Sequence, residues 1–217
     1  MNQRLGNTGN KSTVTLGVRV KPIPSYNFGA VLFLSELGLQ CHLFNRSIQR
    51  LERAADHWKK LILGIDDGET APPLEIAADC TVCLSAMAAV RRILRPSRSA
   101  RVAVKRRSEA LLNLLGNPAL HNVTSVKVRN SWEHLDERLD DILSMRVPGQ
   151  GSVSELHVSP KPPDARTIVM RRFDPTEFTI HFANDAISLI PCVDEMKELS
   201  GLIDNAYVRL QTERVNV

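Results

Sequence analysis

The sequence predicts a mainly α-helical protein, an up-down helical bundle of about five helices with a small antiparallel β-meander inserted before the last helix. Two observations predict this fold. In the first two thirds of the chain, apolar residues recur at steps of four and three, which is the spacing of helices that bury one face. After about residue 148, this spacing gives way to short alternating runs separated by turn residues, which is typical of strands.

Two long helices are predicted first, over about residues 28–64 and 73–95. The second begins at Pro72-Pro73, where proline suits a first helical turn, and Pro96 ends it. The apolar stripe of the first helix is Leu37, Cys41, Phe44, Ile48, Leu51, Ala55, Trp58 and Ile62. The stripe of the second is Ile76, Cys80, Cys83, Met87, Val90 and Leu94.

Three further helices are expected, at about residues 97–115, 124–146 and 191–212. Gly116-Asn117-Pro118 ends the first of these. The core stripe of the helix at 124–146 is Val128, Trp132, Leu135, Leu139 and Ile142. Strands are expected at 154–158, 167–173, 177–183 and 186–190, and an alternating run at 14–20 could join the edge of their sheet.

These elements divide the chain into three parts. Residues 1–27 form a polar tail and an N-terminal strand, residues 28–147 a four-helix bundle, and residues 148–217 the β-meander with the C-terminal helix packing on the bundle. The 217 residues, 43% hydrophobic and 24% charged, are typical of a soluble globular protein. We find neither an apolar run of about 18 residues nor a secretion signal, and therefore expect a cytoplasmic protein without a membrane partner.

The cysteine pair Cys80 and Cys83 has the C-x-x-C spacing of a redox motif or of half a zinc site. Both residues lie on the apolar stripe of their predicted helix, and no second pair of ligands follows. We therefore predict that they pack in the core, and we expect neither a metal site nor a cofactor.

Positive charge is concentrated around Pro96. The net charge of +4 is compatible with a nucleic-acid partner but does not identify one. The crowded basic residues are Arg91, Arg92, Arg95, Arg98, Arg101, Lys105, Arg106 and Arg107. They form either a solvated helix face or a surface that follows RNA phosphates. In the second interpretation the RNA-binding residues are Arg91, Arg92, Arg95, Arg98 and Arg101.

The most informative motif lies in the helix predicted at 124–146. On a helical wheel, Arg129, Asn130, Glu133 and His134 share the face opposite the core stripe. An arginine could hold a scissile phosphate and a histidine could move a proton, which together are the needs of metal-free RNA cleavage. The alternative is a surface pair of Arg129 with Glu133 and a solvated or interfacial His134.

An α-helical bundle that carries Arg129, Asn130 and His134 in this order resembles the HEPN superfamily (higher eukaryotes and prokaryotes nucleotide-binding). The signature of that superfamily is an arginine, four to six residues and a histidine, with a polar residue after the arginine. The resemblance covers the bundle and the last helix, whereas the strand at 14–20 and the meander depart from the minimal fold.

The resemblance implies a homodimer in which two such helices build one cleft, with Arg129, Asn130 and His134 as catalytic residues and Glu133 in support. Many members are metal-independent endoribonucleases of toxin–antitoxin or defence systems, so RNA and an antitoxin or regulatory protein are the implied partners. Other members bind RNA, nucleotide or a protein without catalysis, and such a non-catalytic module is the alternative function. A bundle that serves only as a scaffold is the third.

Overall fold

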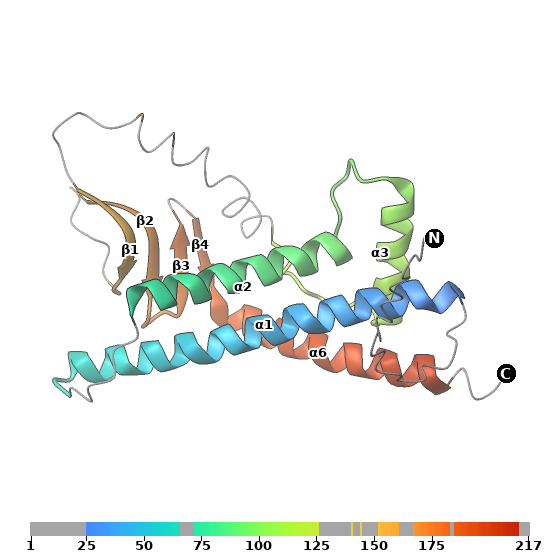
Figure 1. Cartoon of the computed structure of the whole chain (residues 1–217), viewed down its shortest axis with the longest axis horizontal. Helices are drawn as coiled ribbons and strands as arrows, with labels where there is room; N and C mark the ends of the chain where they lie inside the picture. Colours follow the sequence, from blue (N-terminus) through green and yellow to red (C-terminus); the bar gives the residue numbers. More distant parts are fainter. Residues whose placement is uncertain are drawn as a thin grey trace, which may run out of the picture.

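Figure 1 shows a mainly helical molecule in which a small four-stranded sheet precedes the last helix. The computed structural model describes residues 25–65, 72–125, 140, 144, 152–160, 167–182 and 185–212. The helices within these ranges are α1 (Ser25–Ile62), α2 (Pro73–Leu94), α3 (Val102–Leu114) and α6 (Leu189–Thr212). The strands are β1 (Ser152–Val158), β2 (Thr167–Asp174), β3 (Thr179–Phe182) and β4 (Asp185–Ser188).

The centre of the fold is α1, which packs against α2 on one side and α6 on the other (Figure 1). Both neighbours run antiparallel to α1 and therefore parallel to each other, an arrangement that differs from the predicted up-down order of five helices (Figure 1). The hydroxyl of Tyr207 on α6 lies 2.7 Å from the hydroxyl of Ser35 on α1 and so fixes their relative position. By contrast α3 runs across the other helices in Figure 1 and buries only one short face, at Ser108, Leu111 and Leu112.

The predicted stripe of α1 is buried from Leu37 to Ala55, but not to its end. Trp58 is only half-buried, and Ile62 is 59% exposed. The physical reason is visible in Figure 1, where α1 extends past the start of α2, so that among the described elements α2 does not cover its last turns. Helical periodicity shows which face of a helix is apolar, but not where its neighbour stops.

α2 is strongly apolar and has buried residues along its length from Ile76 to Leu94. Within the described residues it is the one helix long and apolar enough to cross a membrane. Half of its most apolar window is buried inside the protein.

Asp79 is the charged residue on this buried face. Arg50 on α1 donates from Nε to both carboxylate oxygens of Asp79, at 2.8 and 2.9 Å, and from Nη2 to the hydroxyl of Ser47, at 3.2 Å. This two-pronged contact neutralises a carboxylate that is only 5% exposed. It also raises the pKa of Arg50, chiefly through the hydrogen bond to Asp79.

The sheet has the order β1-β2-β3-β4, but it is not the antiparallel meander that the sequence predicts. β1 and β2 pair in parallel, with Ser152 opposite Thr167, whereas β2–β3 and β3–β4 are antiparallel. The link of eight residues at 159–166 can span up to about 28 Å. That length is enough for the chain to run back along β1, a seven-residue strand of about 23 Å. The proline-rich link therefore joins two parallel strands and is not a hairpin turn.

Other boundaries also differ from the prediction. Residues 189 and 190, expected at the end of the last strand, are the first two residues of α6, and β3 is shorter than the predicted strand at 177–183. α3 begins at Val102 rather than near Ser97, because Ser97–Ala100 form a turn in which the Ala100 amide donates to the Ser97 carbonyl at 3.0 Å. Thr124 and Ser125 are not helical, so the fourth predicted helix does not start at 124. Asp140 and Ser144 within that segment are helical, while its other residues after 125 and the strand at 14–20 lie outside the described residues.

Candidate nucleic-acid interface

The turn between α2 and α3 carries the densest positive charge of the chain. No acidic residue occurs between Asp79 and Glu109, whereas eight basic residues do. Six of these are exposed, and we call the surface they form the basic corner: Arg92, Arg95, Arg98, Arg101, Lys105 and Arg106. A polyanion meets no competing carboxylate in this stretch of sequence.

Hydrogen bonds hold the backbone of the basic corner in a fixed shape. The Arg95 amide closes the last turn of α2 by donating to the Arg91 carbonyl at 2.7 Å. The buried Ser108 hydroxyl on α3 donates to the Leu94 carbonyl at the end of α2, at 2.5 Å. Lys105 Nζ donates to the Arg98 carbonyl at 2.6 Å and braces the turn from outside. The exposed cations therefore project from an ordered frame.

The other two basic residues of this stretch point inward. The Arg107 guanidinium lies 4.2 Å from the centre of the Phe33 ring, a cation–π contact that joins α3 to α1. Arg91 donates from Nη1 to the Thr124 carbonyl. Of the five predicted RNA-binding residues, Arg91 thus has a structural partner, while Arg92, Arg95, Arg98 and Arg101 belong to the exposed corner.

The turn at residues 121–124 is held by a second anchor, the carboxylate of Glu195 on α6. Glu195 accepts the backbone amides of Asn122 and Val123 at distances of 2.8–2.9 Å and the side-chain amide of Asn122 at 2.7 Å. Arg91 and Glu195 together fix the point from which the chain continues toward Arg129. The sequence did not single out Glu195, because its position beside Met196 and Leu199 resembles the polar edge of an ordinary amphipathic helix.

The predicted catalytic residues Arg129, Asn130 and His134, with Glu133, lie outside the described residues. Arg129 follows Thr124 by five residues in the sequence, a length of chain that spans at most about 18 Å. In the sequence, Arg129 thus follows by five residues the Thr124 carbonyl that Arg91 binds.

A separate polar cluster, formed by Arg172, Asp174 and His181, ties the sheet together. Arg172 Nη1 lies 3.2 Å from an Asp174 carboxylate oxygen, and Nη2 lies 2.7 Å from Nε2 of His181. Arg172 also donates to the carbonyls of Ser159 and Pro160 just after β1. Burial lowers the pKa of His181 below 6.5, and the Arg172 cation adds to this effect against the opposing Asp174 carboxylate. A neutral His181 can accept the Arg172 proton, whereas a protonated one cannot.

We expect this cluster to make the fold less stable as the pH falls below about 6.5, because the unfolded chain then takes up a proton at His181 before the folded chain does. Above that pH, His181 is neutral in both the folded and the unfolded chain, and the cluster stabilises the fold fully. Denaturant unfolding at about pH 7.5 and pH 5 should show a smaller acid loss in His181→Gln than in the unmodified protein. The matched control is His42→Gln, at an exposed position on α1. An identical acid loss in His181→Gln and in the unmodified protein contradicts this assignment.

The cysteines are buried, as the sequence predicts for Cys80 and Cys83. Burial raises the pKa of the Cys80 thiol to about 12 and that of Cys83 well above 9.0, so both are protonated and poor nucleophiles at neutral pH. Within the described residues, no three His, Cys, Asp or Glu side chains are grouped so that they could hold a metal ion.

Comparison of the chain with models of known protein families, with curated proteins and with solved structures gives no match.

Proposed function

We propose that this protein binds RNA through the basic corner and cleaves it, without a metal, at Arg129 and His134. The observation that carries the proposal is the basic corner itself, with six exposed cations on an ordered turn inside a stretch that lacks acidic residues. Phosphate contacts provide most of the affinity in binding that does not depend on base sequence.

The position of the motif in the chain supports the catalytic part of the proposal. Arg91 near the end of α2 donates to the Thr124 carbonyl, and Arg129 follows Thr124 by five residues in the sequence. For cleavage, RNA held by the basic corner would have to reach this segment. A dimer, as the HEPN resemblance implies, would bring together two copies of this segment and two basic corners.

The chemistry needs only the groups of the motif and of the RNA itself. The 2′-oxygen of a ribose forms a bond to its own phosphorus as the bond to the 5′-oxygen breaks. One His134 takes the proton of the 2′-hydroxyl, and the partner's His134 gives a proton to the leaving 5′-oxygen. Arg129 holds the phosphate oxygens in two-pronged fashion, and Asn130 orients histidine or phosphate. The products are a 2′,3′-cyclic phosphate and a 5′-hydroxyl.

A specific observation favours the alternative, a module that binds RNA, nucleotide or a protein partner without cleaving it. Glu133, Asp136, Glu137, Asp140 and Asp141 place five carboxylates within nine residues around His134. Such a run repels phosphate. In this alternative the basic corner still binds RNA, and His134 takes part in no reaction.

RNA binding is tested with a triple variant of the basic corner, Arg95→Ala with Arg98→Ala and Arg101→Ala. We expect its affinity for single-stranded RNA at about 0.1 M salt to fall by about tenfold to a hundredfold, and the slope of log K against log salt to lose about two units, since each phosphate contact contributes about 0.7. Fluorescence anisotropy across a salt series measures both quantities.

The matched control removes three exposed cations elsewhere, with alanine at Arg46, Arg53 and Lys197. Both variants lower the net charge of +4 by three, so a difference between them reflects location rather than total charge. Equal losses in the two variants would refute the basic corner as the RNA-binding surface.

A further inference from the structure

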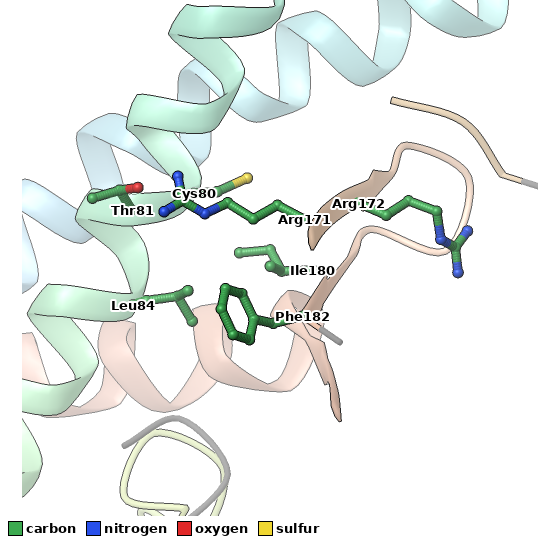
Figure 2. Close-up of a pocket in the computed structure, with 7 residues that line it drawn as sticks. All are labelled: Cys80, Thr81, Leu84, Arg171, Arg172, Ile180 and Phe182. Atoms are coloured by element: carbon green, nitrogen blue, oxygen red, sulfur yellow. The ribbon is translucent and has the colours of Figure 1, made fainter. Parts of the chain in front are cut away.

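A small hollow lies between α2 and the sheet, about three helical turns before the basic corner (Figure 2). It opens to solvent and has room at its centre for about one water molecule. The lining residues are Cys80, Thr81, Leu84, Arg171, Arg172, Ile180 and Phe182. Most of this lining is apolar, and one of its two arginines places its guanidinium within it.

Arg171 is that arginine. Successive residues of a strand point to opposite faces, and Figure 2 shows the Arg171 guanidinium beside Cys80 and Thr81 of α2 while Arg172 points away. The Arg171 side chain is half-buried, its Nε atom is fully buried, and no acceptor for that Nε–H occurs among the described residues. Buried donors in folded proteins are nearly always satisfied, so this N–H offers a binding position for an acceptor that the described residues do not supply.

The charge around the hollow leads to the same conclusion. Arg50 neutralises Asp79, Asp174 offsets Arg172, and His181 is shifted toward its neutral form. Cys80 stays protonated, because its pKa is about 12. Of the two arginines that line the hollow, Arg172 has the Asp174 carboxylate as a partner, whereas Arg171 has no carboxylate partner among the described residues.

We propose that Arg171, with the hydroxyl of Thr81, binds a single phosphate group at the mouth of this hollow. A guanidinium presents two parallel N–H groups that match two oxygens of a phosphate, and the Thr81 hydroxyl can donate to a third. The free space admits one oxygen and keeps the rest of the group at the opening. The group comes either from inorganic phosphate or from the end of an RNA chain, and neither source depends on the RNA cleavage proposed above.

Sodium phosphate is the probe, with sodium chloride of equal ionic strength as the reference. At a phosphate concentration ten times the Kd, we expect the Tm of the unmodified protein to rise by about 3–6 °C. The rise should vanish in Arg171→Met, fall in Thr81→Val, and persist in Arg46→Met, which removes an exposed cation of α1 instead. A rise that survives in Arg171→Met, or one that disappears in Arg46→Met, overturns the site.

The stability of the variant without phosphate provides a second criterion. Methionine replaces an unsatisfied guanidinium by an apolar chain of similar length, so Arg171→Met should melt at or above the Tm of the unmodified protein in chloride. A marked fall in Tm would instead assign Arg171 a purely structural role. Should the variant fail to fold, the NMR signal of the Arg171 Nε–H in the unmodified protein decides, since the proposal requires a saturable shift with phosphate and none with chloride.

Short RNAs that carry either a 5′-phosphate or a 5′-hydroxyl identify the source. Tighter binding of the 5′-phosphate form, with the preference lost in Arg171→Met, assigns the site to an RNA end. Equal binding of both RNAs together with the shift by inorganic phosphate assigns it to free phosphate. Equal binding without that shift contradicts the proposal, whatever the result for the basic corner.

Discussion

Replacing His134 by alanine is expected to slow RNA cleavage by about 10²- to 10⁴-fold and to change RNA affinity by less than about threefold, because general acid–base catalysis contributes to the reaction step and not to phosphate binding. Cleavage by the unmodified protein should continue in EDTA and leave 2′,3′-cyclic phosphate ends. Its rate should follow a bell-shaped pH profile, since one imidazole must be neutral and the other protonated. Gel analysis of end-labelled RNA measures all three features.

The control for this variant is His42→Ala, which removes an exposed histidine from α1 and should leave cleavage unchanged. If His134→Ala cleaves as fast as the unmodified protein, any nuclease present is a contaminant. If the unmodified protein binds RNA but shows no cleavage, the non-catalytic function replaces the catalytic one. Loss of RNA affinity in the basic-corner variant remains interpretable in both cases.

Replacing Glu195 by alanine is expected to lower the free energy of unfolding by about 2–4 kcal/mol, because the buried Val123 amide and two part-buried donors of Asn122 lose a charged acceptor. The amides of Asn122 and Val123 and the Asn122 side chain all donate to this carboxylate, which is only 9% exposed. In a chain of this size, the Tm should fall by roughly 5–15 °C. Chemical denaturation with circular dichroism measures the change.

Glu198→Ala provides the matched control, because Glu198 is an exposed carboxylate one turn further along α6. It should change the free energy of unfolding by less than about 0.5 kcal/mol. Glu195→Gln, which keeps the shape but not the charge, should fall between the two. A loss in Glu198→Ala as large as that in Glu195→Ala would show that the effect comes from the net charge of α6.

The helices of the core could be predicted because each one buries a single face. The steps of four and three from Leu37 to Ala55 and from Ile76 to Leu94 correspond to buried residues of α1 and α2. Trp58 and Ile62 continue the same steps but are only half-buried and exposed, because the stripe carries no information on the length of the neighbouring helix. The parallel pairing of β1 and β2 was missed for a related reason: alternation defines the faces of a strand but not the direction of its partner.

The candidate site could be predicted only where the residue types in one short stretch of sequence indicate the site without knowledge of distant contacts. The cluster of arginines around Pro96 is plain in the sequence, and four of the five predicted RNA-binding residues lie at the exposed corner. The inward direction of Arg91 depends on Thr124, which lies 33 residues further along the chain. The contact between Arg171 and α2 likewise joins distant segments. The pairing of Asp79 on α2 with Arg50 on α1 also joins distant segments and was not predicted.

The four buried cysteines can report on local unfolding of the helices that carry them. Cys41 lies on α1, Cys80 and Cys83 lie on α2, and Cys192 lies on α6, all buried and free. Burial holds the pKa of Cys41 and Cys192 at about 12, as it does for Cys80. A thiolate-directed label can therefore reach these sulfurs only when the surrounding helices separate. Without any engineered probe, the rate of labelling at each cysteine measures how often its own helix leaves the core.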